Sequence, residues 1–288
     1  MHHYSDSEIR NICKEKLEAL EHWLRRLIDL TLTPVYGDIF IYEDEKGNRL
    51  VKTKISTSVE DRLRKEPNRY SRKIDAILLD DAIDIICKPD LFKNHFNAPF
   101  KVAFPDGRDV TRTFLKRLTD PRNRLAHANP ISTRQAEQVI CYTNDVIDSI
   151  KEFYRVENMQ VEFNVPLIIK VIDSFGNTYF RENIAKAPSG EIVIDHSNDS
   201  KYYLRPNDIL TLEVEVDPSF EESDYTIEWR GVIAEMKNLK KVALQLENRH
   251  VGQQFSLSCN ITSKEDWHRI RGKVDDVLIY QIKVLPPV

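Results

Sequence analysis

The sequence contains few of the residues that cross-link a chain or hold a metal. Only four of its 288 residues are cysteines, and neither a C-x-x-C pair nor a Cys/His cluster occurs at the spacing of zinc ligands. We therefore predict no disulfide framework, no metal site and no cofactor. The four cysteines are Cys13, Cys87, Cys141 and Cys259.

Long hydrophobic runs are also missing. No apolar stretch approaches the ~18 residues that a membrane-spanning helix needs. Charged residues interrupt the first segment at Glu8, Arg10, Lys14 and Glu15, so this segment lacks the core of a signal peptide. The sequence therefore predicts a cytoplasmic protein with no membrane partner.

The chain has no excess of positive charge. Its net charge of -4 argues against a protein that coats nucleic acid or an acidic membrane, although it leaves room for a local basic site. Residues 1–157 carry 27 Lys and Arg against 26 Asp and Glu, and the remainder carries 15 against 20. We expect any anion-binding surface in the first half. The length predicts two domains.

The first half has the periodicity of helices. Apolar residues recur every three or four positions in residues 5–32 and again in residues 74–87, which predicts two core helices. Between them, residues 38–55 are typical of a β-hairpin around a Lys-Gly-Asn turn, inserted into a helical bundle. The charged run 60–73 indicates a solvated helix face, with an RNA-backbone track as the alternative.

Residues 121–130 place strongly ionisable side chains at a spacing that catalysis could use. Asp120 suits an N-cap and Pro121 suits the first helical position. Arg122 and Asn123 would then lie in the first turn of a helix, where free N–H groups favour anions. At about 100° per residue, Asn123 and His127 share a face, whereas Arg122 and His127 diverge by roughly 140°. A single helix therefore cannot bring Arg122 and His127 together.

The order of Arg122, Asn123 and His127 resembles the signature of the HEPN superfamily, in which an Arg and a polar residue are followed by His. A predicted closing helix, with a capping box at Ser132 and Gln135, also resembles that family. The resemblance covers residues 1–158. It implies a small helical bundle and a metal-independent endoribonuclease, with RNA as substrate.

The resemblance implies a role for each residue of the motif. In such enzymes the RNA 2'-OH attacks the adjacent phosphorus. His127 suits proton transfer because imidazole changes charge near neutral pH. Arg122 suits the non-bridging oxygens because its planar fork binds phosphate bidentately. Asn123 would orient His127 or the scissile phosphate, and Arg124 would hold a flanking phosphate.

Family members usually pair their motifs across a two-fold axis, so a homodimer through the bundle is expected. Many are toxins or antiviral defence effectors, which we expect here too. Two other interpretations stay open. One is a non-catalytic HEPN-like module that senses nucleic acid or a protein, and the other is an interaction protein whose motif only caps a helix.

After residue 158 the hydrophobic period changes from 3.6 to 2, beginning with the alternation in residues 161–171. We predict domains at 1–158 and 159–288, and therefore a multi-domain fold of α and β elements. About seven strands without a credible helix predict a β-sandwich that binds a ligand or mediates assembly. Trp229 and Cys259 resemble the core Trp and one core Cys of immunoglobulin-like domains, with Val214 or Leu212 in place of the second Cys.

Overall fold

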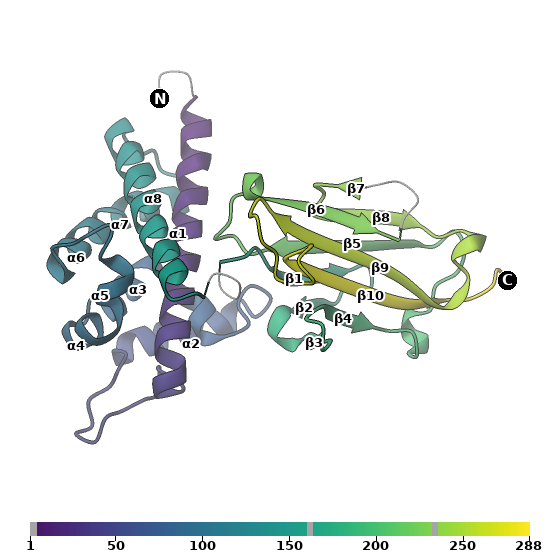
Figure 1. Ribbon diagram of the computed structural model, residues 1–288, viewed down its shortest axis with the longest axis horizontal. Helices are drawn as coiled ribbons and strands as arrows, with labels where there is room; N and C mark the ends of the chain where they lie inside the picture. Colours follow the sequence, from purple (N-terminus) through teal and green to yellow (C-terminus); the bar gives the residue numbers. More distant parts are fainter. Residues whose placement is uncertain (1–4, 160–163, 232–235) are drawn as a thin grey trace. The chain divides into compact units, whose positions relative to one another are not determined.

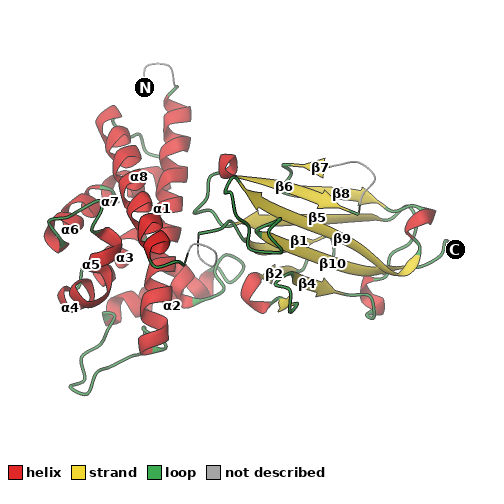
Figure 2. Ribbon diagram, viewed as in Figure 1, coloured by secondary structure: helices red, strands yellow, loops and turns green. Residues whose placement is uncertain are grey.

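A computed structural model describes residues 5–159, 164–231 and 236–288 of the chain. The chain forms two compact units, Met1–Gln160 and Val161–Val288, each with its own core. In Figures 1 and 2 the first unit is helical and the second is built mostly of strands. None of the helices in the described ranges has the length and apolar character needed to cross a membrane.

The first helix, α1 (Asp6–Tyr36), is the longest of the helical unit and supplies much of its core. It begins at a capping box, in which the Ser5 side chain accepts from the Glu8 N–H and Glu8 accepts from the Ser5 N–H. It ends at Gly37, whose φ of +68° suits a residue without a Cβ. The helix continues beyond residue 32, where the sequence predicted its end, and includes Pro34.

The predicted hairpin at residues 38–55 forms only around its turn, where the Asp44 N–H donates to Asn48 and the Leu50 N–H donates to Tyr42; its two strands are absent. Only an isolated bridge joins Glu43 to Arg49. The N–H groups of Ile41 and Tyr42 both donate to the Asp38 carbonyl, so the expected first strand folds back into a turn. The expected second strand runs into α2 (Thr53–Lys65). Ile55, the last apolar residue of the predicted hairpin, lies on this helix.

The charged run 60–73 lies on α2 and on the segment that follows it. Several of its cations are paired within the unit: Arg62 meets Asp81 at 2.8 Å and Arg72 meets Asp29 at 2.7 Å. The predicted helical face covers only the first part of the run, because α2 ends at Lys65. The predicted helix at 74–87 is split into a 3₁₀ turn, η1 (Lys73–Ala76), and α3 (Leu79–Ile86).

The rest of the helical unit consists of short helices followed by one long helix. Four phenylalanines of the short helices and the turn after them are buried, as expected for core residues: Phe92, Phe96, Phe100 and Phe104. The long helix packs against α1, where the rings of Trp23 and Tyr154 lie 5.9 Å apart. The elements are α4 (Pro89–Leu91), η2 (Phe92–Phe96), α5 (Asn97–Phe100), α6 (Arg108–Arg117), α7 (Thr119–Ala126) and α8 (Thr133–Val156).

The second unit contains two sheets, with strand orders β2-β1-β5-β8 and β3-β4-β10-β9-β6-β7. Neighbouring strands are antiparallel except β4 and β10, which run parallel. The predicted residues 161–163 of the first strand lie outside the described residues. The strands are β1 (Ile168–Asp173), β2 (Thr178–Phe180), β3 (Ala185–Lys186), β4 (Ile192–Asp195), β5 (Ile209–Val216), β6 (Tyr225–Arg230), β7 (Met236–Lys237), β8 (Lys241–Gln245), β9 (Gly252–Ser263) and β10 (Asp276–Val284).

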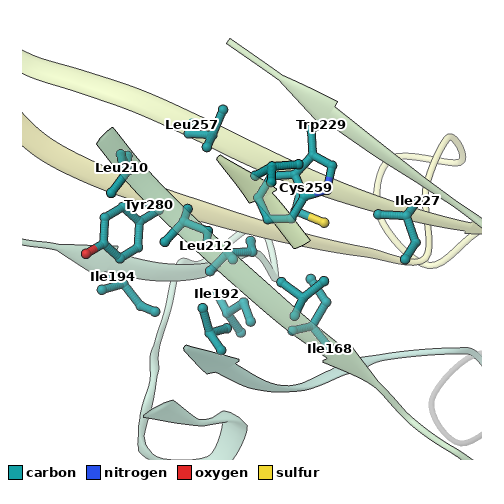
Figure 3. Close-up of a cluster of buried hydrophobic side chains, with 14 of the residues drawn as sticks. Ile168, Ile192, Ile194, Leu210, Leu212, Ile227, Trp229, Leu257, Cys259 and Tyr280 are labelled. Carbon is teal, nitrogen blue, oxygen red and sulfur yellow. The ribbon is translucent and has the colours of Figure 1, made fainter. Parts of the chain in front are cut away.

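Side chains from both sheets form one buried cluster (Figure 3). Burial alternates strictly along β10, as period-2 patterning requires. Trp229 of β6 lies directly opposite Cys259 of β9, and Leu212 of β5 belongs to the same cluster. The alternation read from the sequence therefore identified the core of this unit.

Candidate functional site

The motif helix α7 begins two residues before the predicted position. Leu118, in α conformation, is both the C-cap of α6 and the N-cap of α7, so one helix runs directly into the next. Asp120 therefore lies inside the first turn and does not cap it. Its carboxylate accepts instead from Arg124 Nε at 3.0 Å and from Gln135 Nε2 at 2.8 Å. The expected anion site at a free helix N-terminus is not formed.

Arg122 is anchored by a carboxylate that sequence reasoning missed. Its Nε donates to Glu21 Oε1 of α1 at 2.7 Å. The other oxygen of Glu21 accepts from Arg25 Nη2, also at 2.7 Å, and Arg25 Nε donates to the Ile77 carbonyl at 2.6 Å. The Glu21 and Arg25 side chains are 9% and 11% exposed, whereas Arg122 is 21% exposed. The network therefore leads from the core of the unit to its surface.

The charges of this network do not balance. Two guanidinium groups share one carboxylate, so the group of three carries a formal charge of +1. Burial lowers the pKa of Arg25, and Glu21 opposes that effect. Arg122 is the most exposed of the three groups, and Asp75 also acts on Arg25 from outside the trio. Because Glu21 occupies the Nε of Arg122, an incoming phosphate would meet the Nη edge of the guanidinium end-on.

His127 is the C-cap of α7, and its side chain is exposed. The chain then turns through Ala128 at φ +57°, with hydrogen bonds from Ala128 N–H to Leu125 and from Asn129 N–H to Arg124. This is a Schellman motif, in which a left-handed residue ends the helix. Arg10 of α1 donates to the Ala128 carbonyl at 2.6 Å and fixes the turn.

The motif residues are brought together only in part. Arg122 Nη1 lies 3.4 Å from Asn123 Oδ1, and Asn123 shares a helix turn with His127 through the His127 N–H. Within the described part of the chain, no side-chain contact joins His127 to Arg122. Arg124 is half exposed and pairs with Asp120. One chain thus presents a fixed Arg122 and a solvent-facing His127 without closing them around a substrate.

One signal in the sequence marks the missed residues. Glu21 and Arg25 lie four residues apart within the apolar stripe of the first helix, where charges are rarely buried without partners. Such a pair points to a buried ion network. The third member lies 101 residues away, and no local pattern identifies it.

Several buried polar side chains of the second unit bond to one another. Asp276 accepts from Arg181 at 2.5 and 2.9 Å. Asp173 accepts from the hydroxyls of Tyr179 and Tyr280, and the Tyr179 hydroxyl lies 2.8 Å from His196 Nε2. Over residues 5–159, 164–231 and 236–288, no group of three or more His, Cys, Asp or Glu is placed to hold a metal ion.

Comparisons with models of known protein families, with curated proteins and with solved structures found no match to this chain.

Proposed function

We propose that the helical unit is a HEPN-type endoribonuclease that cleaves RNA without a metal ion. The observation that carries the proposal is that the Glu21 carboxylate accepts hydrogen bonds from both Arg25 and Arg122. This carboxylate fixes Arg122 in place but also serves Arg25, and Arg122, the more exposed of the two, lies on the helix that ends at His127. A fixed guanidinium whose Nη1 makes only a long bond of 3.4 Å to Asn123 suits the phosphate of an RNA backbone.

The proposed reaction moves two protons. The 2'-oxygen loses its proton and bonds to the adjacent phosphorus, while the bond to the 5'-oxygen breaks and that oxygen gains a proton. The products are a 2',3'-cyclic phosphate and a 5'-hydroxyl. His127 transfers one proton, and Arg122 stabilises the charge on the non-bridging oxygens. Asn123 orients the phosphate beside Arg122, and Arg124 holds a flanking phosphate.

A homodimer completes the proposed site. Arg122 and His127 diverge by roughly 140° on a regular helix, and they make no side-chain contact within the described part of one chain. A two-fold interface through the bundle would place two copies of the motif in one cleft, so that one copy's Arg122 acts with the other's His127. Complementation tests this arrangement. Arg122→Ala and His127→Ala homodimers should each be inactive, and co-refolded heterodimers should recover part of the activity.

The test of the function is incubation of the full chain with total RNA in EDTA. We expect cleavage that leaves 2',3'-cyclic phosphate ends and is abolished by His127→Ala. His250→Ala, which changes a histidine of the second unit, is the matched control and should leave cleavage intact. The protein should also arrest growth on expression, as a toxin or defence effector does, and His127→Ala should relieve the arrest. Cleavage that requires Mg²⁺ would contradict the mechanism.

A second candidate is a HEPN-like module that binds nucleic acid or a protein without cutting. Two observations favour it: Arg122 is already engaged by Glu21, and no described side chain orients His127. This candidate predicts RNA binding that survives His127→Ala, with intact RNA in both cases. The EDTA incubation separates it from the nuclease.

For the second unit we propose an immunoglobulin-like sandwich that recognises a ligand or partner. Two observations support this fold: Trp229 lies opposite Cys259, and β4 runs parallel to β10 at the other side of the same sheet. Leu212 and Val214 of β5 are both buried and occupy the region expected for the absent second cysteine.

A further inference from the structure

Three side chains form an ordered cluster on the helices around the motif. The ring of Phe114 on α6 meets the ring of Tyr142 on α8 edge-on, with centroids 4.8 Å apart. The guanidinium of Arg117 lies 4.9 Å from the centre of the Phe114 ring and donates to the Tyr142 hydroxyl at 3.3 Å. Arg117 is exposed, and the two rings are half-buried. The cluster therefore holds the planar guanidinium of Arg117 over the ring of Phe114 at the surface.

The cluster and the motif helix α7 contact the same face of α8. Gln135 and Tyr142 are seven residues apart, so they face nearly the same direction. Gln135 touches Asp120 of α7, and Tyr142 touches Arg117 of α6. The two contacts are about 10 Å apart along the α8 axis. Stacked nucleotides advance about 3.4 Å each, so this distance corresponds to about three stacked nucleotides.

Charge along this stripe suits a nucleic-acid strand. Gln138 lies between the two contacts and is uncharged. The carboxylate of Asp120 is engaged by Arg124 and Gln135. The exposed Asp145 on α8 lies about one turn beyond Tyr142, on the side away from the motif. A strand that enters at Arg117 and runs toward Arg122 thus meets cations and amides first.

We infer that Phe114, Arg117 and Tyr142 form a platform on which one base of single-stranded RNA stacks, next to the proposed cleavage site. The inference rests on the proposed function for its substrate, RNA, and adds that the strand must be unpaired. Guanidinium planes and aromatic rings stack against exposed bases with little sequence preference. In a duplex the bases are already stacked on one another and leave no free face for Arg117.

Equilibrium binding tests the platform separately from catalysis. The full chain carrying His127→Ala is titrated against a fluorescein-labelled single-stranded oligoadenylate, and against the same strand paired with oligouridine. Further substitutions are Arg117→Ala, Arg117→Lys and Tyr142→Phe. Arg64→Ala is the matched control, because Arg64 is also an exposed helical arginine with a nearby partner, Asp61. Circular dichroism of each variant verifies that the helices are retained.

We expect tighter binding of the single strand than of the duplex. Arg117→Ala should weaken single-strand binding by about tenfold, the loss of one stacked base. Arg117→Lys should recover little of it, because an ammonium keeps the charge but lacks the plane. Tyr142→Phe should cause a smaller loss through the hydrogen bond that orients Arg117. Arg64→Ala should change binding by less than about twofold.

Three results would overturn the platform: undetectable binding of the single strand, equal binding of the duplex, or full recovery by Arg117→Lys. The outcomes also separate the two proposals. Binding that depends on Arg117 in a protein that never cleaves RNA keeps the platform and removes the nuclease. Cleavage by the wild-type chain with no effect of Arg117→Ala on binding keeps the nuclease and removes the platform.

Discussion

The helical unit and the strand unit both bury charged side chains, but their networks end differently. In the strand unit, Asp276 is fully buried and is matched by one guanidinium, that of Arg181, and by the Ile168 N–H. In the helical unit, Glu21 serves both Arg25 and the more exposed Arg122. The first network is balanced and closed, as a structural ion pair is. The second shares one carboxylate between two guanidinium groups, and the more exposed one is the Arg122 that we propose binds phosphate.

The sharpest way to break this comparison is to remove Glu21. Glu21→Leu leaves Arg25 buried without a counter-ion, so the free energy of unfolding should fall by about 3–5 kcal/mol. Urea unfolding followed by circular dichroism at helical wavelengths measures the loss. A loss below about 1 kcal/mol would mean that Glu21 is not the counter-ion of a buried charge.

The double variant Glu21→Leu with Arg25→Met separates stability from positioning. Replacing both buried partners by apolar groups should recover most of the stability. Arg122 then has no carboxylate to fix it, so RNA cleavage should stay reduced although the unit is folded. If cleavage returns together with stability, Glu21 is structural only, and the difference between the two networks has no functional meaning.

The matching change in the strand unit is Arg181→Met. It leaves the Asp276 carboxylate buried and unpaired, and it should cost about 3 kcal/mol or more. Urea unfolding followed by tryptophan fluorescence reports on this unit through the buried Trp229 when Trp23, the buried tryptophan of the helical unit, is replaced by Phe in both proteins compared. RNA cleavage, measured where the protein is still folded, should be unchanged, because this network has no member in the motif. Loss of cleavage in the folded variant would argue against chemistry confined to the helical unit.

The stability of the strand unit should depend on pH through His196, with a smaller effect than those of the substitutions above. Burial lowers the pKa of His196, against the opposing effect of Asp173, Asp199 and Asp195. The unfolded chain then binds the proton more readily than the folded one. Stability should therefore fall as pH drops below about 6.5, the ordinary imidazole range.

Urea midpoints at pH 7.5 and 5.5, compared between wild type and His196→Gln, isolate this contribution. The glutamine keeps a donor for the Tyr179 hydroxyl but does not titrate in this range. The drop in midpoint on acidification should be smaller in the variant. An equal drop in both proteins would assign the pH dependence to other groups.

The sequence predicted those parts of the structure that depend on neighbouring residues. The Ser132 capping box begins α8, and the period-2 alternation of the second half corresponds to regular strands such as β5, in which buried residues alternate. It failed where several side chains compete for one group. Asp120 was expected to cap a helix, but Arg124 and Gln135 take its carboxylate and α6 continues into α7.

In the candidate site, too, the sequence predicted the local part and missed the contact made over a long distance in the chain. The spacing of Arg122, Asn123 and His127 is visible in the sequence, because all three lie on one short segment. The carboxylate that fixes Arg122 comes from Glu21, 101 residues away, and only the packing of α1 against α7 reveals it. The first strand of the predicted hairpin is absent for a local reason, because the carbonyl of Asp38 closes a turn that the apolar pattern does not show.

The smallest predicted effect compares two left-handed turns, one in each unit. Ala128 follows the motif helix at φ +57°, and Asn207 precedes β5 at φ +77°. Alanine adopts this conformation at a cost, whereas asparagine tolerates it better. Ala128→Gly should raise the free energy of unfolding by about 0.5–1 kcal/mol, and Asn207→Gly should raise it by less. Urea midpoints of the two variants measure both. Destabilisation by Ala128→Gly would show that the Schellman turn holding His127 is not formed in solution.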